Sequence, residues 1–392
     1  MRLRIINFLK RHSGLLIFLR GVVRFFLRIT YLFPLRKKTA IFASFGGRKF
    51  DDSPRAIYEE LCTREEFKDW KFIWAFVEPD KFTLPRGQKV KIDSFRFFVK
   101  LFTSRVWVSN SGMDRGLELR NPRIVRIETW HGTPLKKICG EEHTNAVQKK
   151  PSGKKDAKAI RCAQSEYDRE ILSRVLHATK ESFLLCDLPR NDSLLRYTHK
   201  DRLAVRRKLG IADDRRIIFY MPTYREYLVN EKKEHYLAPP IDLGRWQAQL
   251  GGEYVFLVRA HYAVSTALDL QENDFVRDVS DYEHLNDLYA VADILISDYS
   301  SAFIDGAICG MPMLCFAYDL EEYCEKRGLY LELAQTLPCE ICRNEDEVLA
   351  QIAGMDVQAA REKTAAFARK FVPHAGHATE TVVAEMKRRL GL

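Results

Sequence analysis

The stretch Asp293–Ala317 constrains the fold more strongly than any other part of this chain. Its parts are, in order, an apolar run Asp293–Ser297, a polar elbow Asp298–Ser301, a helical pattern Ala302–Cys309 that Gly310 ends, and an apolar run Met311–Ala317. Short apolar runs on either side of a helix are typical of buried strands, and parallel strands need such a crossover connection. The stretch therefore predicts one unit of a parallel α/β sheet.

The elbow of this unit offers hydroxyls and backbone N–H groups at the carboxyl end of a strand. A ligand is expected there in an open α/β sheet, and a helix N-terminus favours a phosphate group. Ser300 and Ser301 also stand where an N-cap belongs, so helix capping alone is the competing interpretation. Asp298 orients a histidine, binds a ribose hydroxyl or only caps the helix. We predict that these three residues contact a phosphate-bearing ligand.

Strands alternate with helices along the rest of the chain. Apolar runs of strand type precede a break at Pro189–Asp192 (39–44, 72–77, 106–109, 123–129 and 159–164) and follow it (216–220, 254–258 and 275–279). Helical patterns at 345–352, 357–371 and 378–390 complete the chain. Such alternation implies parallel sheets with helices on both faces. We therefore predict an α/β fold with two facing Rossmann-like domains, 39–195 and 196–392, and a site in the cleft between them.

The net charge of +10 is concentrated at the N-terminus. Residues 1–50 hold twelve Lys and Arg and no Asp or Glu, so the remaining chain carries 10 − 12 = −2. Within residues 1–38 bulky apolar side chains alternate with basic ones, but the longest run without Lys or Arg is shorter than the roughly 20 residues of a membrane span. We expect residues 1–38 to form a basic amphipathic segment on an anionic membrane surface; packing on the body or binding nucleic acid is the alternative.

The nine cysteines are scattered along the chain, as in proteins of a reducing compartment. The body is nearly neutral, which argues against nucleic acid as a partner. Together with the basic N-terminus, these features predict a peripheral protein on the cytoplasmic face of the cell membrane.

Polar side chains follow several of the predicted strands. They are Asn110 after the run 106–109, His131, Gly132 and Thr133 after 123–129, Thr223 and Arg225 after 216–220, and Arg259 and His261 after 254–258. A histidine at a strand end can act as a general base near neutral pH, although a lone histidine is more often structural. Arg259 beside His261 can stabilise charge on a phosphoryl oxygen, or can form a capping salt bridge.

Several common sites are excluded. No G-x-x-x-x-G-K-[ST] or G-x-G-x-x-G motif occurs, so neither a P-loop nor the usual dinucleotide site is expected. His131 and His261 lack the spacing of a metal pair on one helix, and Cys339 and Cys342 have no second pair at zinc-site spacing. We therefore expect no metal and no cofactor.

Four segments in a fixed order give the chain a resemblance to a known family. They are ETWHGTPLKK, YMPTYRE, RAHY and SDYSSAFIDGAICGMPMLCFAYDLEEY, with weaker matches at SFGGRKFDDSPRAIYEEL and PRND. Over residues 39–380 the chain resembles the CDP-glycerol glycerophosphotransferase family of teichoic-acid and capsule enzymes. The resemblance implies a fold like that of the GT-B glycosyltransferases. It also implies transfer of glycerol or ribitol phosphate from CDP-glycerol or CDP-ribitol to a hydroxyl of a lipid-linked glycan or growing polymer, with release of CMP.

The resemblance also implies roles for residues. His131 looks like the base that deprotonates the acceptor, and His261 like a second essential histidine that steadies phosphate charge. Ser300 and Ser301 match serines that hold the donor phosphates. The donor side further includes Asp298, Arg259, Thr223 and Arg225, and the acceptor side Gly132, Thr133 and Asn110. We expect domain 39–195 to bind the acceptor and domain 196–392 the donor, with residues 1–38 on the membrane.

The chain departs from the family pattern at two places. Tyr262 follows the second histidine where Pro is usual, and His374-Ala375-Gly376-His377 replaces an Asp-Gly pair. The alternative function is a sugar-nucleotide-dependent GT-B glycosyltransferase of cell-envelope polysaccharide synthesis, because a fold does not fix a function. A non-catalytic membrane or nucleic-acid binder would depend on the N-terminus alone.

Overall fold

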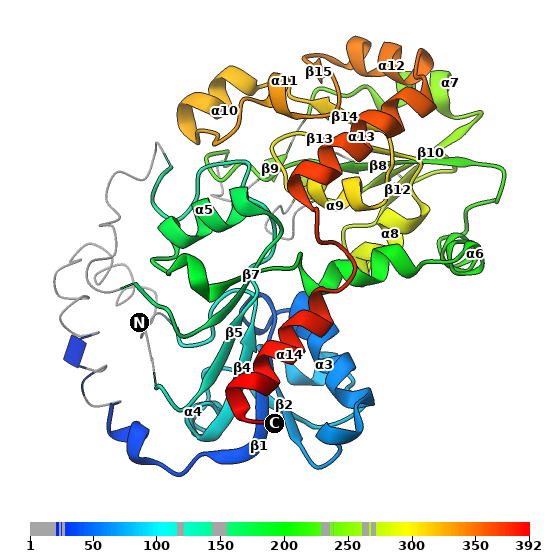
Figure 1. Ribbon diagram of the computed structural model, residues 1–392. Coiled ribbons are helices and arrows are strands. Elements are labelled where there is room, and N and C mark those ends of the chain that lie inside the picture. Colours follow the sequence, from blue (N-terminus) through cyan, green and yellow to red (C-terminus); the bar gives the residue numbers. More distant parts are fainter. Residues whose placement is uncertain are drawn as a thin grey trace, which may run out of the picture. The chain divides into compact units, whose positions relative to one another are not determined.

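The computed structural model describes residues 21–22, 25, 28–115, 121–142, 155–228, 236–237, 239–260, 266–267 and 272–392. Two sheets organise this part of the chain (Figure 1). The first has the strand order β3-β2-β1-β4-β5-β6-β7 and the second the order β12-β10-β8-β13-β14-β15. The registered strand pairs in both sheets run parallel.

The strands of the first sheet are β1 (Arg36–Ala43), β2 (Lys71–Phe76), β3 (Gln88–Lys91), β4 (Ser104–Ser109), β5 (Val125–Glu128), β6 (Ile160–Ala163) and β7 (Phe183–Leu185). Those of the second are β8 (Arg216–Met221), β10 (Tyr254–Val258), β12 (Val276–Asp278), β13 (Ile294–Ser297), β14 (Met313–Phe316) and β15 (Ile341–Cys342). Strands β9 (Tyr236–Leu237) and β11 (Thr266–Ala267) pair separately.

The helices are α3 (Asp52–Thr63), α4 (Phe95–Thr103), α5 (Glu166–Val175), α6 (His199–Lys208), α7 (Leu243–Leu250), α8 (Leu285–Val291), α9 (Ala302–Ile308), α10 (Leu320–Lys326), α11 (Leu333–Thr336), α12 (Glu345–Ala353), α13 (Val357–Phe371) and α14 (Ala378–Leu390). The 3₁₀ segments are η1 (Arg28–Leu32), η2 (Phe45–Gly47), η3 (Glu65–Phe67), η4 (Pro79–Lys81), η5 (Lys180–Ser182) and η6 (Pro189–Arg196).

Successive residues of the central strands of the first sheet face opposite layers. Phe42 of β1 and Trp74 of β2 pack against Tyr58 of α3. Ile41, the residue before Phe42, belongs instead to a buried cluster with Phe97 of α4. Helices therefore cover both faces of these strands, which explains why the strand sequences are continuous apolar runs.

The second sheet is covered in the same way. Phe219 of β8 and Leu295 of β13 share a buried cluster with Phe303 of α9. The next residue along β8, Tyr220, lies in a second cluster with Trp246 of α7. Burial on both faces again selects apolar residues at consecutive positions.

The strand order of each sheet reverses at one point. In the first sheet the reversal lies between β1 and β4, and in the second between β8 and β13. Ligands of open α/β sheets bind outside the carboxyl ends of the strands at such a reversal. We call the residues that follow β1 and β4 the first switch point, and those that follow β8 and β13 the second switch point.

The chain divides into two compact units. Unit 1 comprises Met1–His131, Ala157–Cys162 and Thr379–Leu392, and unit 2 comprises Gly132–Asp156 and Ala163–Ala378. One division therefore falls at the peptide bond between His131 and Gly132. The predicted domains 39–195 and 196–392 follow the two sheets, because the first sheet ends at Leu185 and the second begins at Arg216. As independent domains they stay a prediction.

The expected α/β class with parallel sheets is confirmed. Strand β10 and helices α13 and α14 have the predicted bounds, since their patterns are long or strongly periodic. Helix α4 was not predicted, because its sequence FRFFVKLFT is aromatic on more than one side. Its N-cap is nevertheless legible: Ser94 Oγ accepts a hydrogen bond from the backbone N–H of Phe97 (3.1 Å).

Much of the predicted amphipathic segment 1–38 lies outside the described residues, which within it are 21–22, 25 and 28–38. In the described part of the chain, no helix has the length and apolar character needed to cross a membrane.

Candidate active site

Asp298 joins the two loops of the second switch point. Its carboxylate accepts hydrogen bonds from the backbone N–H groups of Thr223 (2.9 Å) and Tyr299 (2.6 Å). Beside it, Ser297 Oγ donates to the carbonyl oxygen of Met221 (2.6 Å). Asp298 is fully buried, so its oxygens accept hydrogen bonds from other groups of the protein. We therefore assign Asp298 a positioning role in place of the expected contact with a ligand.

Arg225 is the cation of this buried cluster. Its Nη1 donates to Asp298 (2.7 Å), and its Nε and Nη2 donate to the two carboxylate oxygens of Asp319 (2.9 and 2.8 Å). The guanidinium also lies over the rings of Tyr299 and Tyr318, 4.9 and 5.3 Å from their centroids. Arg225 is fully buried, and a buried charge persists only where it is paired in this way. It therefore supports the loops of the switch point rather than reaching out to a phosphate.

The two predicted serines differ from each other. Ser300 Oγ accepts a hydrogen bond from the backbone N–H of Ala302 (3.1 Å), which caps α9. Ser301 occupies the N-cap position itself, but its side chain makes no capping hydrogen bond. Both side chains are partly exposed. Capping thus accounts for Ser300 but not for Ser301, whose hydroxyl is left for another purpose.

Gly132 lies directly against Ser301. A Cβ atom built on Gly132 would lie 2.5 Å from Ser301 Oγ, and the backbone φ of Gly132 is +153°. No other residue fits so close to the hydroxyl without displacing it. The His-Gly-Thr-Pro elbow and the Ser-Asp-Tyr-Ser-Ser elbow, far apart in the sequence, therefore meet at this contact within unit 2.

Thr223 and Thr133 are both buried beside these elbows. Thr223 Oγ1 has no hydrogen-bond partner among the described residues. A buried hydroxyl of this kind is expected to hydrogen-bond to a ligand or a water molecule. Thr133 Oγ1 instead lies 2.8 Å from Gln164 Oε1 and 3.1 Å from Asp168 Oδ2. The Thr133 hydroxyl therefore lies against other groups of the protein, and the acceptor contact expected from the sequence stays a prediction.

Lys136 is a residue that the sequence interpretation missed. Its ammonium group interacts electrostatically with Arg327, Glu226 and Asp298, and burial lowers its pKa to about 8. The group remains largely protonated at neutral pH and adds positive charge to the second switch point. The pair of lysines that follows the His-Gly-Thr-Pro elbow was the available signal.

His131, which follows β5, lies beside the first switch point. Asn110, which follows β4, is buried, and its Oδ1 accepts a hydrogen bond from the backbone N–H of Phe45 (2.8 Å). The Asn110 carbonyl oxygen lies 3.0 Å from His131 Nδ1, so Nδ1–H donates to it and the neutral ring carries its lone pair on Nε2. The Trp130 ring stacks on the imidazole with centroids 4.4 Å apart. The histidine is thereby held in the tautomer that a base at Nε2 requires.

The loop after β1 forms the tight turn that its glycine pair predicts. Phe45, Gly46 and Gly47 all have positive φ values, and the Gly46 N–H donates to Ser111 Oγ (2.9 Å). Two consecutive glycines after a strand were the sequence signal for this turn. The loop links the ends of β1 and β4, as Asp298 links the ends of β8 and β13.

Arg259 and His261 follow β10. Arg259 Nη1 donates to the carbonyl oxygens of Val279 (2.9 Å) and Tyr282 (2.8 Å), which ties the end of β10 to the segment after β12. Arg259 therefore has a structural role in addition to any contact with a ligand. His261 lies outside the described residues, and its role stays a prediction.

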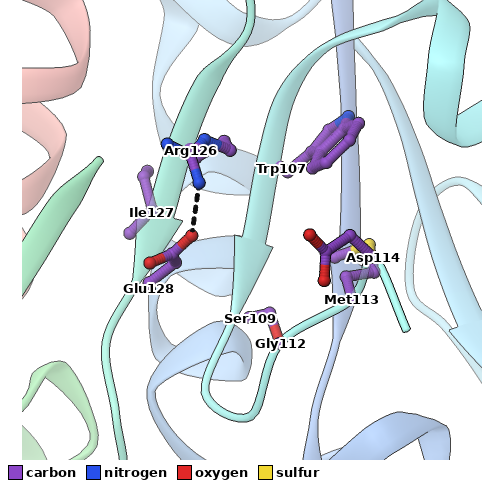
Figure 2. Close-up of a pocket in the computed structure, with 8 residues that line it drawn as sticks. All are labelled: Trp107, Ser109, Gly112, Met113, Asp114, Arg126, Ile127 and Glu128. Carbon is purple, nitrogen blue, oxygen red and sulfur yellow. Dashed lines mark hydrogen bonds and ion pairs between the residues drawn. The ribbon is translucent and has the colours of Figure 1, made fainter. Parts of the chain in front are cut away.

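A small pocket in unit 1 opens at the carboxyl ends of β4 and β5 (Figure 2). It is lined by Trp107, Ser109, Gly112, Met113, Asp114, Arg126, Ile127 and Glu128. Glu128 accepts hydrogen bonds from Arg126 (2.9 Å) and Arg161 (2.6 Å). The pocket places an aromatic ring, two carboxylates and an arginine close in sequence to Asn110.

Among the described residues, no group of three or more His, Cys, Asp or Glu side chains is arranged to hold a metal ion.

Three comparisons place this geometry among known proteins. The family model described as CDP-Glycerol:Poly(glycerophosphate) glycerophosphotransferase matches residues 25–387. The chain is 31% identical over 352 residues to a teichoic acid poly(glycerol phosphate) polymerase of Staphylococcus epidermidis, with 86% of this chain and 48% of the relative covered. It is 32% identical over 358 residues to a polymerase of the same name from Bacillus spizizenii, with 88% and 89% covered.

Solved structures support the same relationship. Structures of the wall teichoic acid polymerase TagF, one of them with CDPG, superpose with a TM-score of 0.81 at 27% identity and cover 100% of this chain and 98% of theirs. The likeness agrees with the expected GT-B-like fold class. The chain spans about half the length of the Staphylococcus epidermidis relative and most of the length of the Bacillus spizizenii relative.

Proposed function

Because the chain belongs to the CDP-glycerol:poly(glycerophosphate) glycerophosphotransferase family, we propose that it transfers a polyol phosphate unit. The donor is CDP-glycerol or CDP-ribitol, and the acceptor is a hydroxyl of a lipid-linked glycan or of a growing polyol-phosphate chain. The relatives named as poly(glycerol phosphate) polymerases and the TagF structure with CDPG favour glycerol. The reaction serves the synthesis of a teichoic acid or capsule-type polymer.

His131 is the general base of this reaction. The Asn110 carbonyl accepts the Nδ1–H hydrogen bond, so the basic lone pair of the neutral ring lies on Nε2. A histidine oriented in this way takes the proton of the acceptor hydroxyl, and such catalysis contributes a factor of about 10²–10⁴ in rate. His261 is the second histidine of the proposal, carried over from the family resemblance.

The donor phosphates contact the hydroxyls of the second switch point. Ser301 Oγ is not used in capping, Thr223 Oγ1 lacks a partner among the described residues, and Lys136 supplies positive charge nearby. Hydrogen bonds from such groups to phosphoryl oxygens stabilise the charge that develops during transfer. Residues 196–392 form the donor domain in this proposal and residues 39–195 the acceptor domain.

The chemical step is an in-line displacement at the β-phosphorus of the donor. A bond forms between the acceptor oxygen and that phosphorus, and the bond from the phosphorus to the oxygen of CMP breaks. The acceptor proton moves to His131 Nε2, and CMP leaves with the electron pair. Phosphoryl transfer of this kind depends mainly on positioning and on charge stabilisation.

The observation that carries the proposal is the pair of switch points on a chain of this family. Unit 1 presents a histidine in a fixed tautomer, and unit 2 presents hydroxyls beside a buried ion-pair cluster. Neither set alone provides both a base and phosphate ligands.

The test is CMP release by the full-length protein with a lipid-linked disaccharide acceptor in detergent. CDP-glycerol, CDP-ribitol and a set of UDP-sugars are supplied separately. We expect CMP from a CDP-polyol and no UDP from the sugars. Silence with both CDP-polyols, together with UDP release from one sugar donor, would refute the proposal in favour of a glycosyltransferase.

We also propose that residues 1–38 attach the protein to the cytoplasmic face of the cell membrane. In the described part of this segment Phe25, Ile29 and Leu32 are 68%, 56% and 82% exposed, among basic residues. Phe95 of α4, also in unit 1, is 86% exposed beside Arg96. Exposed apolar side chains interspersed with cations suit an anionic lipid surface.

Vesicle co-sedimentation tests this attachment. The chain is expected to pellet with vesicles that contain anionic lipid and to remain in solution with neutral ones or at high salt. Leu32→Ser is expected to weaken binding, whereas Leu195→Ser, at a position 53% exposed in unit 2, serves as the matched control. Equal binding to neutral and anionic vesicles would contradict the electrostatic part of the proposal.

A further inference from the structure

A chain of buried hydrogen bonds runs through unit 2 from Thr133 to helix α9. Thr133 Oγ1 contacts Gln164 Oε1 (2.8 Å), and Gln164 Nε2 donates to Asp187 Oδ1 (2.7 Å). Asn191 Nδ2 then bridges Asp187 Oδ1 (3.2 Å) and Asp305 Oδ1 (3.0 Å). All five side chains are at least nine-tenths buried.

This chain of contacts closes into a ring. Asp305 lies on α9, whose N-cap residue is Ser301, and Ser301 lies against Gly132. Gly132 is joined by a peptide bond to Thr133, where the ring began. The ring therefore fixes the one contact at which the two elbows of the candidate site meet.

The geometry of the ring requires a proton beyond those of its neutral members. The Thr133 hydroxyl has one hydrogen but lies within hydrogen-bond distance of two acceptors, Gln164 Oε1 at 2.8 Å and Asp168 Oδ2 at 3.1 Å. With Gln164 Nε2 at Asp187, both contacts are satisfied when Asp168 carries a proton and donates it to Thr133 Oγ1. With the amide turned, Gln164 Nε2 donates to Thr133 Oγ1, the hydroxyl donates to Asp168, and Asp187 carries the proton.

Burial favours the protonated form of two carboxyl groups here. Desolvation, together with the neighbouring Asp305 carboxylate, raises the pKa of Asp168 and of Asp187 to about 7 each. One oxygen of each, Asp168 Oδ1 and Asp187 Oδ2, has no hydrogen-bond partner in the described part of unit 2. A buried carboxylate in such a setting is more stable with a proton attached.

The charged and titratable groups around the ring come from several elements. They are Arg190 of η6, which donates to Asp305 (2.7 Å), Tyr167 of α5 beside Asp168, and Tyr289 of α8 and Cys309 after α9, both near Asp305. Arg190 offsets the charge of Asp305. The other two carboxyl groups hydrogen-bond to neutral amide, hydroxyl and backbone groups.

We propose that Thr133, Gln164, Asp168 and Asp187 are positioning residues that hold Gly132 against Ser301, and that they do so only while the ring retains its extra proton. None of them touches a substrate in this proposal. It rests on the proposed function, because the contact that they fix belongs to the transfer site. Ionisation of these carboxyl groups as the pH rises through about 7 is then expected to loosen the elbow and to lower activity.

The first test removes the Thr133 hydroxyl. Thr133→Val is expected to lower kcat/KM for CMP release by about 10²-fold, the size of effect that a small misplacement produces, while Thr133→Ser restores most of the activity. Thr364→Val is the matched control, because Thr364 is equally buried in unit 2 and its Oγ1 donates to the Met311 carbonyl (3.0 Å). It is expected to lower the unfolding temperature as Thr133→Val does, with kcat/KM intact. Equal kcat/KM in the two valine variants would overturn the proposal.

The second test removes the ionisation of Asp187 but keeps the hydrogen bonds that its side chain accepts. Asp187→Asn keeps Oδ1 as the acceptor for three N–H groups, and asparagine tolerates the left-handed backbone at this position (φ +66°). In the parent protein this pKa is raised in the folded state, so the site contributes stability at low pH and loses it as pH rises from about 4 to about 7. The variant is expected to gain on the parent over that range and to keep its activity to a higher pH.

These readouts separate the inference from the function that it rests on. If the parent protein releases no CMP from either CDP-polyol, the proposed function fails. The pH dependence of the unfolding temperature still tests the ring, because it needs no substrate. Parallel unfolding-temperature curves for Asp187→Asn and the parent between pH 4 and pH 8 would refute a proton on Asp187, and a parent unfolding temperature that does not fall over this range would refute the extra proton altogether.

Discussion

The two sheets have the same strand order but use their switch points differently. At the first, Asn110 is the buried organiser and presents a partly exposed histidine through a single backbone contact. At the second, Arg225 and Asp298 are fully buried, burial also lowers the pKa of Lys136, and the side chains of Ser300 and Ser301 are partly exposed. The same topology thus supports a mobile proton in one unit and a fixed charge arrangement in the other.

The difference follows from what each task requires. A general base must meet its substrate and exchange a proton, so it needs access and one hydrogen bond that sets its tautomer. Phosphate ligands must be in place before the reaction, so the loops that carry them are tied down by buried ion pairs. Substitutions at the two switch points should therefore have opposite signatures, with activity lost at the first and stability lost at the second.

The largest effect is expected for His131→Ala. Loss of the base should lower kcat for CMP release by about 10²–10⁴-fold, with little change in the unfolding temperature because the side chain is only partly buried. His374→Ala, at an exposed position in unit 2, is the matched control. Undiminished turnover in His131→Ala would show that His131 is not the general base.

Arg225→Met should have the reverse signature. It leaves Asp298 and Asp319 without their cation, and breaking a buried pair costs about 3–5 kcal/mol in the free energy of unfolding. Urea denaturation of this variant can be compared with that of Arg216→Met, at the start of β8, whose ion pair with Glu253 is exposed and is worth less than about 1 kcal/mol. Similar losses in both would show that the buried cluster is not the anchor of the second switch point.

The smallest effect is expected from the serines. Ser301→Ala should lower kcat/KM by about 10–100-fold, the value of a hydrogen bond to a charged group, without loss of stability. Ser300→Ala should lose about 1 kcal/mol of stability, because Ser300 caps α9, as should Ser94→Ala at the N-cap of α4. If Ser301→Ala is silent in both measurements, its hydroxyl has no place in phosphate binding.

Sequence reasoning identified the positions of the site better than their roles. The ends of strands can be recognised in the sequence because apolar runs stop there. Asn110, His131, Thr223 and Asp298 were all found in this way. The orientation of these side chains could not be predicted from the sequence, because their exposure depends on which distant segments cover them. Asn110 and Asp298 are buried organisers, and Thr133 faces inward to Gln164.

Lys136 was missed for the same reason. The pair of lysines after the His-Gly-Thr-Pro elbow marks the position, but its significance comes from Arg327, Glu226 and Asp298, which lie far away along the chain. The ring from Thr133 to Asp305 was equally invisible, because its members come from four separate stretches of the sequence.

The sequence by itself determined the α/β class, the parallel strands and the places where polar groups follow them. These depend on local patterns: apolar runs for buried strands, glycine and serine at the elbows, and basic residues at the N-terminus. Only the tertiary structure decided that Gly132 lies against Ser301, that Arg225 is enclosed by two carboxylates, and that the Thr133 hydroxyl lies within hydrogen-bond distance of two oxygens. Burial and charge pairing depend on which distant segments meet, and no local pattern records that.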